Sequence, residues 1–291
     1  MDRLSALLER FRVRAHLFHA GRLCGLTHFD AKPGRGFLHV LRRGDMELTH
    51  RRDDGVLVRI EVHEPTLLFY PRPLEHDFHN APADGSDFVC ASLDFEGGGT
   101  HPLVRALPAL VVLPLQQVPG LDASLSLLFA EADQMRCGHR FLADRLFEVV
   151  LLQLLRWLLD HAKEAGVSVG LMAGLSDTHL ALTLTALHEQ PRKAWRLQDM
   201  AAQAGMSRSA FAAKFKVVLG QTPADYLADW RMSLAQAHLR HGHPVKLIAS
   251  ELGYANASAL SRVFAQRLGA SPTAWKKESL QTSSKTGKEL S

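Results

Sequence analysis

The chain has few cysteines and no long apolar run, and these shortages exclude several classes of protein. Its 291 residues include only 3 cysteines, too few for the disulfide framework of a small secreted scaffold. The most apolar stretch, residues 146–159, is interrupted by Glu148, Gln153 and Arg156 and is too short to span a bilayer. The first residues lack the apolar region of a signal peptide. The sequence therefore predicts a cytoplasmic protein that does not bind membranes.

Neither sign of charge dominates the chain, but the two signs are unevenly distributed. Residues 176–291 hold 15 basic and 8 acidic residues, a net charge of +7, whereas residues 1–175 hold 19 and 22, a net charge of −3. Because contact with phosphates requires basic groups, the last third of the chain is the candidate partner of a nucleic acid. A solvated basic face would give the same excess, so charge alone does not decide the function.

Short apolar runs separated by turn residues occupy residues 11–115, notably residues 39–41, 56–60, 67–70 and 88–90. Such runs without intervening helices predict an antiparallel barrel or sandwich. From about residue 122 to 165 the apolar period becomes helical. The second helical stripe, within residues 144–163, is wide enough to require burial on two sides. That helix either packs only on the barrel or is shared with a second copy of the chain in a homodimer.

The last third of the sequence contains an internal repeat. Residues 201–206 recur as residues 249–254 at an offset of 48, and Phe215 and Gly220 recur as Phe264 and Gly269 at an offset of 49. Each copy predicts a helix, a short turn that contains glycine, and a second helix. Ser207 is the expected cap of the second helix in the first copy, and Asn256 or Ser258 in the second. This pattern is typical of a helix-turn-helix motif, and an ordinary helical bundle is the alternative.

The repeat resembles the DNA-binding region of the AraC/XylS regulator family. The stretches that carry the resemblance are residues 204–211, Phe215-Lys216, residues 220–227, residues 230–232, Ala235, Ile248-Ala249, Gly253-Tyr254, Ser258, Phe264 and Ser271-Pro272. The resemblance implies a transcription regulator whose two motifs enter successive major-groove segments of double-stranded DNA. It also favours an activator, for which RNA polymerase would be a partner.

The expected fold is a multidomain α+β protein. Residues 1–121 are expected to form a cupin-like sensor barrel, residues 122–165 a helical dimerisation or packing segment, residues 166–178 a linker, residues 179–277 the double helix-turn-helix domain and residues 278–291 a disordered tail. Residues 4–175 resemble the cupin-type sensor domain of one AraC-family branch, some members of which respond to oxidants through cysteines.

Candidate DNA contacts follow from the faces of the two second helices. In the second motif we expect the exposed residues to be Ala257, Ser258, Ser261 and Arg262. Arg262 is suited to bidentate reading of a guanine, with phosphate contact as the alternative. In the first motif we expect the exposed residues to be Ser209, Ala212, Ala213 and Lys216, with Arg208, Lys214 and Lys216 on phosphates. Because alanine donates no hydrogen bond, the first motif is expected to read sequence loosely.

Residues 71–80 resemble the second cupin motif, but only His39 stands in the region of the first. The three-histidine, one-carboxylate site of a cupin oxygenase is therefore not supported, and no glycine-rich phosphate loop is present, so we expect no enzyme. The alternative is a cupin-type metal-dependent enzyme, or a metal-binding sensor with only non-specific DNA contacts. Cys24, His39, His76 and Cys90 could form a zinc site, a redox pair, or merely packed and hydrogen-bonded side chains. A small organic effector in the barrel is a further hypothesis.

Overall fold

The computed structural model describes residues 2–52, 54–134 and 136–279. Its contacts divide the chain into two compact units. Residues Arg12–Val167 form one, called here the sheet unit, and Met1–Phe11 together with Ser168–Ser291 form the other, called the helical unit. None of the helices in the described residues is long and apolar enough to cross a membrane.

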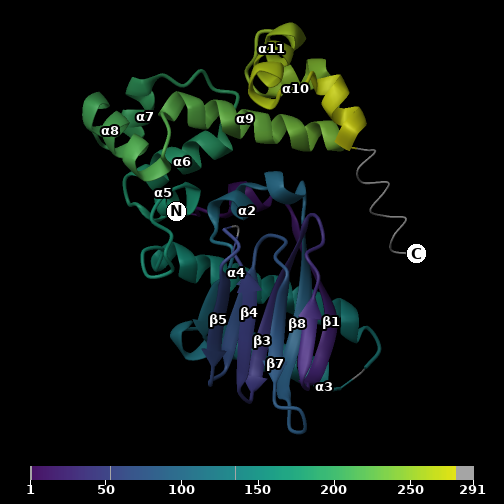
Figure 1. Cartoon of the computed structure of the whole chain (residues 1–291). Helices are drawn as coiled ribbons and strands as arrows, with labels where there is room; N and C mark the ends of the chain where they lie inside the picture. The colour runs from purple at the N-terminus through teal and green to yellow at the C-terminus, as the bar shows by residue number, and fades with distance from the viewer. Residues whose placement is uncertain (1, 53, 135, 280–291) are drawn as a thin grey trace. The chain divides into compact units, whose positions relative to one another are not determined.

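The sheet unit contains two antiparallel sheets (Figure 1). The five-stranded sheet has the order β1-β8-β3-β6-β9 and the four-stranded sheet the order β2-β7-β4-β5. The strands are β1 Val13–Leu23, β2 Leu26–Phe29, β3 Arg35–Arg43, β4 Met46–Arg51, β5 Leu57–Val62, β6 Thr66–Tyr70, β7 His76–Asn80, β8 Ser86–Phe95 and β9 Val111–Pro114. One core cluster combines side chains of both sheets, for example Leu48 and Phe78 with Leu68 and Phe88. The antiparallel architecture expected from the sequence is thus confirmed.

Helices complete the sheet unit. They are α2 Pro102–Ala106, α3 Leu121–Asp133 and α4 His139–Asp160, with short 3-10 turns at Gly98–Thr100 and Leu115–Gln117. Helix α4 packs against α3 and β1 and buries Phe147, Leu154 and Leu158 completely. Its other side leaves Phe141 and Val149 exposed to solvent. The wide apolar stripe therefore packs on the sheet only in part.

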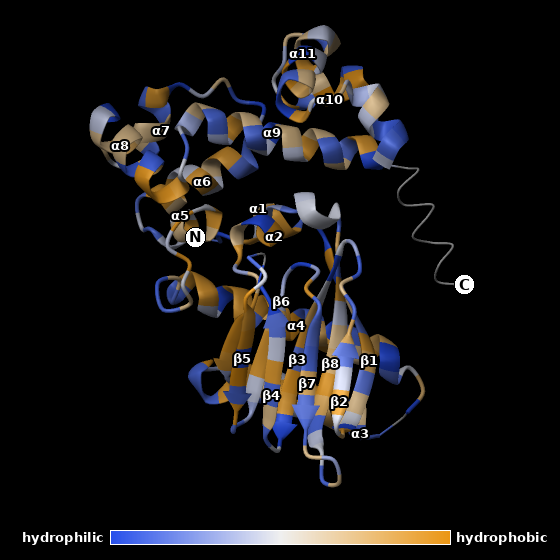
Figure 2. Cartoon of the chain, viewed as in Figure 1, coloured by the Kyte–Doolittle hydropathy of each residue, from blue (hydrophilic) through white to orange (hydrophobic). Residues whose placement is uncertain are grey.

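The helical unit contains the two repeated motifs and the helix that joins them (Figure 1). Its helices are α1 Ser5–Leu8, α5 Leu171–Ser176, α6 Leu180–Glu189, α7 Leu197–Gln203, α8 Arg208–Leu219, α9 Pro223–Arg240, α10 Val245–Glu251 and α11 Ala257–Leu268, followed by a helix over residues 272–279. Figure 2 shows hydrophilic and hydrophobic residues mixed along these helices, as expected of helices with one buried side. The first motif is α7 with α8, and the second is α10 with α11.

Local signals in the sequence explain the two turns. Gly205 and Gly253 both adopt the left-handed conformation, with φ of +64° and +78°. The Ser207 hydroxyl accepts a hydrogen bond from the Ala210 N–H at 3.3 Å, and the Asn256 side chain accepts one from the Ala259 N–H at 2.9 Å. Both are helix caps of the expected kind. The sequence alternatives for the second cap were Asn256 and Ser258, and the structure selects Asn256.

The structure corrects the position of the first 11 residues, which the sequence assigns to the barrel. Leu7 and Phe11 are buried in the helical unit, and the Phe11 and Trp230 rings lie 5.3 Å apart. An Arg3 guanidinium nitrogen donates a hydrogen bond to the Leu175 carbonyl at 2.9 Å. Apolar side chains in a short N-terminal segment thus find their core in a domain that is distant in sequence.

Residues 166–178, which were expected to form a linker, instead contain a packed helix. This helix is α5, whose Met172 and Leu175 are buried. A Cβ added at Gly174 would meet the side chains of Leu184 and Leu219, so this helix is closely packed rather than a free tether. Residues 278 and 279, expected to begin a disordered tail, are helical, and residues 280–291 lie outside the described residues.

Candidate DNA-binding surface and sensor interior

Helix α8 has one buried side and one exposed side. Phe211, Phe215 and Leu219 are buried, while Arg208, Ser209, Ala213 and Lys216 are exposed and Ala212 and Lys214 are half-buried. The predicted contact residues of the first motif therefore lie away from its core. Among the described residues, the side chains of Arg208 and Lys216 have no hydrogen-bond or ion-pair partner, so their charges remain available to a phosphate.

Lys214 differs from the other two cations of the first motif. Its ammonium group lies 2.7 Å from a carboxylate oxygen of Asp177. Asp177 also accepts hydrogen bonds from the N–H groups of His179 and Leu180 at the beginning of α6. Burial raises the pKa of Asp177, but Lys214 and these N–H groups outweigh that effect and lower it overall. Lys214 thus has a structural partner, which the sequence could not indicate because 37 residues separate the two.

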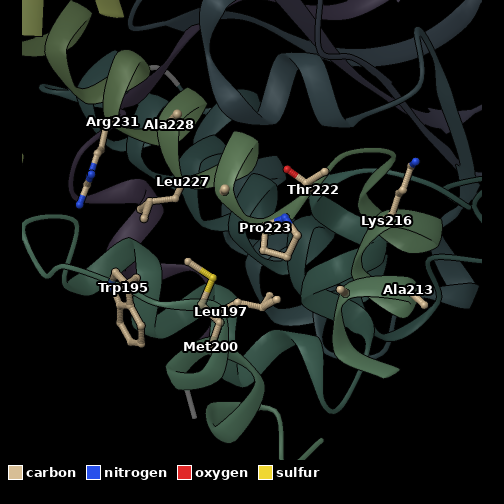
Figure 3. A pocket seen from close by; sticks show the side chains of 12 residues that line it. Trp195, Leu197, Met200, Ala213, Lys216, Thr222, Pro223, Leu227, Ala228 and Arg231 are labelled. Carbon is tan, nitrogen blue, oxygen red and sulfur yellow. The ribbon is translucent and has the colours of Figure 1, made fainter. Parts of the chain in front are cut away.

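An apolar depression adjoins the exposed side of α8 (Figure 3). Its volume is about 680 Å³. The lining residues come from the segment before α7 and from α7, α8 and α9, and they are Trp195, Leu197, Met200, Ala212, Ala213, Lys216, Thr222, Pro223, Ala224, Leu227, Ala228 and Arg231. Short alanine side chains at positions 212 and 213 leave this space open, so the first motif presents a hollow, weakly polar surface.

Helix α11 of the second motif has the same division into sides. Leu260 and Phe264 are buried, whereas Leu268, which the periodicity also predicts as buried, is only half-buried. The expected contact residues lie elsewhere on the helix, with Ser258 and Arg262 exposed and Ala257 and Ser261 half-buried. Arg262 has no hydrogen-bond or ion-pair partner in the part of the chain that the structure describes.

Arg267, which is also on α11, differs from Arg262 because its guanidinium forms ion pairs. Its guanidinium donates to Asp229 at 2.6 Å and to Asp225 at 2.8 Å, both on α9. This double ion pair holds α11 against the connecting helix. Arg267 thus fixes the position of α11 relative to α9. Arg262 lies on the same helix and extends into solvent, so it is presented by a rigid element.

A buried hydrogen bond supports the first motif from behind. His188 of α6 and the Tyr226 hydroxyl of α9 share it at 2.6 Å, and the Phe215 ring of α8 packs on Tyr226 at 5.6 Å between centroids. Burial, with a smaller contribution from Arg10, lowers the pKa of His188 to about 3, so this histidine is neutral at pH 7. His188 could not be identified from the sequence because a buried histidine has no signature in an otherwise apolar helix.

The interior of the sheet unit brings His39 and His76 together. Their Nε2 atoms lie 3.2 Å apart, and His76 Nδ1 lies 2.8 Å from the Leu74 carbonyl oxygen. Since a carbonyl can only accept, Nδ1 of His76 carries the proton and its Nε2 accepts from His39 Nε2. Burial lowers the pKa of both histidines, to about 4 for His76 and well below the usual value for His39, so the pair is neutral.

Several buried polar atoms of the sheet unit have no partner among the described residues, among them His39 Nδ1, the Tyr70 hydroxyl and His50 Nδ1 on the strand beside His76. Aromatic rings surround the pair, with Tyr70 stacked on His76 at 4.0 Å and Phe29 at 4.8 Å between centroids. By the proton assignment above, His39 Nδ1 is an unprotonated acceptor. Leaving such a buried group unsatisfied costs about 1–3 kcal/mol, so a hydrogen-bond donor that reached this atom would be stabilising.

The structure does not assemble the four expected metal or redox residues into one site. Cys90 is buried and opposite His39 on the neighbouring strand, but Cys24 is exposed. Leu23, next to Cys24, pairs with Ser86, four residues before Cys90 on β8, which places the two cysteines about 13 Å apart along the strand. The one group of three potential metal ligands among the described residues lies in the helical unit instead. A tetrahedral site made of all four residues is thus wrong.

These features together define a class of protein, a sensor of the cupin type joined to a double helix-turn-helix DNA-binding unit. Residues 2–160 match a protein family described as Cupin, and residues 200–278 match one described as Helix-turn-helix domain. The first match covers most of the sheet unit and also residues 2–11, which fold with the helical unit, and the second covers the part of the helical unit that holds the two motifs.

Relatives extend the match over nearly the whole chain. Two proteins, each named a putative AraC-like transcription regulator, are 32% identical in Streptomyces lividans and 33% identical in Streptomyces antibioticus. Each alignment covers 95% of this chain and 98% or 99% of the relative. An Escherichia coli protein named RCS-specific HTH-type transcriptional activator RclR is 24% identical over 80% of this chain and 81% of its own length. The chain belongs to the AraC-like transcription regulators.

Proposed function

We propose that this regulator activates transcription and that its two motifs divide the work of binding DNA. The second motif reads base sequence through Arg262, and the first holds phosphates through Arg208 and Lys216. The observation that carries this division is the partner-free guanidinium of Arg262 on the exposed side of α11, whereas the corresponding part of α8 carries Ala212 and Ala213. An activator also requires contact with RNA polymerase in the cytoplasm, and one relative is named an activator.

Fluorescence anisotropy with labelled duplexes tests this proposal. The probe is the DNA upstream of the protein's own gene, and the competitor is a duplex of the same composition in scrambled order. We expect tighter binding to the upstream DNA at moderate salt, and binding to both duplexes at low salt. Equal affinity for the two duplexes at every salt concentration would contradict sequence reading. Transcription in vitro with purified RNA polymerase then separates activation from repression.

We further propose a homodimer formed through α3 and α4. The support is a set of large apolar side chains that solvent reaches on these helices, namely Leu127, Phe141, Leu142 and Val149. Phe141 is the most exposed of these, at 78%. Sedimentation at micromolar concentration should show a dimer for the parent protein and a monomer for Phe141→Glu. A dimer that survives both this change and Val149→Glu would disprove the assignment of this face.

For the sensor we propose a small, mostly apolar effector with one hydroxyl or amino group. Such a molecule would donate to His39 Nδ1 and hydrogen-bond the Tyr70 hydroxyl, which have no partner of their own. Phenol is a suitable probe because it has this chemistry. It should raise the melting temperature of the parent sheet unit within the full chain and have no effect on His39→Phe. Stabilisation by Zn²⁺ that is lost in the same variant would favour a metal sensor instead.

The oxidant hypothesis now depends on Cys24. Burial raises the pKa of the Cys90 thiol well above its usual value, which disfavours the reactive thiolate, whereas Cys24 is exposed. Dilute hypochlorite should change DNA affinity in the parent protein and in Cys90→Ser but not in Cys24→Ser if the sensor is redox-active. An unchanged response in Cys24→Ser would eliminate this mechanism.

A further inference from the structure

The turn between α9 and α10 brings three potential metal ligands together. His238 lies in the last turn of α9, His243 lies in the turn itself, and Glu251 is the last residue of α10. The Nδ1 atoms of the two histidines are 3.1 Å apart, and His238 Nε2 is 3.8 Å from a Glu251 carboxylate oxygen. One ligand atom from each residue lies within 4.8 Å of the other two. This is the one such group among the described residues.

The backbone of the turn fixes this arrangement. Gly242, with φ of +83°, turns the chain back, and the His243 N–H donates a hydrogen bond to the His238 carbonyl at 3.0 Å. The two imidazole rings consequently lie 5.0 Å apart between centroids at an interplanar angle of 33°. Pro244 is the residue immediately before α10. The two rings are therefore held together by local structure and not by chance contact of long side chains.

The chemistry of the group suits zinc. Two ligands bound to Zn²⁺ at 2.0–2.1 Å in a tetrahedron lie about 3.4 Å apart, close to the observed separation of the two nitrogen atoms. Two imidazoles and one carboxylate form a mixed nitrogen and oxygen set, which favours zinc over calcium or magnesium. The ion would bind His238 through Nδ1, the nitrogen that faces His243. Glu251 lies near Nε2 of the same ring, so its exposed side chain would rotate to complete the three-ligand set and leave one position for water.

The surroundings provide access to this group. His238 and Glu251 line an open depression of about 740 Å³, whose other charged side chains are Arg10, Glu189, Arg192 and Lys193. The cations oppose a divalent ion, and the two carboxylates favour it. We therefore expect moderate affinity rather than the tightness of a buried structural site. Solvent reaches 26% of the His238 side chain and 41% of that of Glu251, so an ion can enter without unfolding.

We propose that His238, His243 and Glu251 form a zinc site that braces the second helix-turn-helix motif against the connecting helix. The metal would join the end of α9 to the end of α10, immediately before Leu252 and the turn at Gly253. Its occupation would limit the motion of α10 and thereby position α11 and Arg262. Zinc binding itself is independent of the proposed function, whereas its effect on DNA affinity rests on that function.

Titration of the metal-free full chain with Co²⁺ tests the site. Coordination by nitrogen and oxygen should give visible d–d absorption without a thiolate charge-transfer band, which distinguishes it from any site that uses Cys90. Competition between Zn²⁺ and a chromophoric chelator should show at least 10-fold weaker binding in His243→Ala and in Glu251→Gln. The second variant keeps the shape of a half-exposed side chain, so misfolding does not explain its loss.

His241→Ala is the matched control, because His241 lies in the same turn and its Nδ1 is 3.0 Å from the Ala237 carbonyl. It should bind zinc like the parent chain. Equal weakening in His241→Ala, or unchanged binding in both His243→Ala and Glu251→Gln, would overturn the site. Zinc should also slow hydrogen exchange of α10 and increase affinity for upstream DNA. Bound zinc without slower exchange in α10 would overturn the bracing role, while unchanged DNA affinity beside slower exchange would count against the proposed function instead.

Discussion

The two helix-turn-helix motifs share a sequence pattern but differ in what surrounds them. Both have a left-handed glycine in the turn, a cap on the second helix and a buried phenylalanine at the matching position. The first rests on a buried histidine and tyrosine and presents alanines beside an apolar depression. The second is held by Arg267 and presents Arg262. The two motifs thus share a fold, while their outward residues and their supports differ.

This difference shows that equivalent positions in a repeat are not energetically equivalent. A Cβ added at Gly205 would meet nothing within 4 Å, but one added at Gly253 would overlap the backbone carbonyl of Arg192. In the first motif the turn glycine, Gly205, is therefore required for its backbone conformation alone. In the second motif Gly253 is also required for the close approach of another segment.

The largest expected contrast comes from alanine at these two turns. Gly205→Ala should cost about 1–2 kcal/mol of unfolding free energy, because a left-handed residue with a side chain is strained. Gly253→Ala should cost about 3 kcal/mol or more, since the overlap with Arg192 adds to the strain. Urea unfolding of both variants measures the difference. Equal losses would show that the packing of Arg192 on Gly253 is unimportant.

The next contrast compares an exposed residue of α11, Arg262, with an exposed residue of α8, Ser209. Arg262→Ala should weaken binding to upstream DNA by about 1–3 kcal/mol and have a smaller effect on scrambled DNA. Ser209→Ala, at the exposed side of α8, should change either affinity by less than about 0.5 kcal/mol. Anisotropy titrations at one fixed salt concentration provide both values. An equal loss on both duplexes for Arg262→Ala would identify it as a phosphate contact.

Acid should weaken the first motif more than the second. The folded-state pKa of His188 is about 3 and the unfolded value is about 6.5, so the unfolded chain binds the proton first. Stability is therefore complete above pH 6.5 and falls as the pH decreases toward 3, with a loss of about 1 kcal/mol at pH 5.5. Burial also lowers the pKa of His238 near the second motif. That side chain is partly exposed and lies beside Glu251, so acid should weaken the second motif less.

Hydrogen exchange resolved by peptide, and corrected for intrinsic rates, measures this difference within the full chain. Helices α6 and α8 should lose protection between pH 7 and 5.5, and α11 should lose less. In His188→Gln this pH dependence should disappear, although the variant is less stable at pH 7. If α6 lost the same protection between pH 7 and 5.5 in His188→Gln, a group other than His188 would be responsible for the pH dependence.

The smallest contrast lies within the first motif. Lys216→Ala should reduce the slope of log affinity against log salt by about 1, as expected for one phosphate contact. Lys214→Ala should reduce it less, because the Asp177 carboxylate already neutralises the Lys214 ammonium. Slopes from titrations at four salt concentrations distinguish the two. A larger change for Lys214→Ala would mean that its ion pair opens when DNA binds.

Much of the DNA-binding unit was predictable from sequence because its signals are local. Gly205 and Ser207 specify a turn and a cap within a few residues, and the apolar period assigns Phe211 and Phe215 to the buried side. The surface role of Lys214 was not predictable, since its partner Asp177 belongs to another helix. The burial of Phe11 against Trp230 was missed for the same reason.

In the sheet unit the sequence supplied the strands and the candidate residues but not their association. His39 and His76 were singled out together, and strand pairing brings them within 3.2 Å of each other. Cys24 belonged to the same hypothesis, yet the register of β1 on β8 carries it away from Cys90. A spacing in sequence cannot show such a register, because it depends on which strands pair.

Local sequence patterns were enough to identify the kind of protein, through a repeat whose turns, caps and apolar periods act over a few residues. Tertiary structure decided which of the charged residues remain available and which histidines are neutral and buried. Those properties depend on desolvation and on partners that are distant along the chain, and no local pattern encodes them.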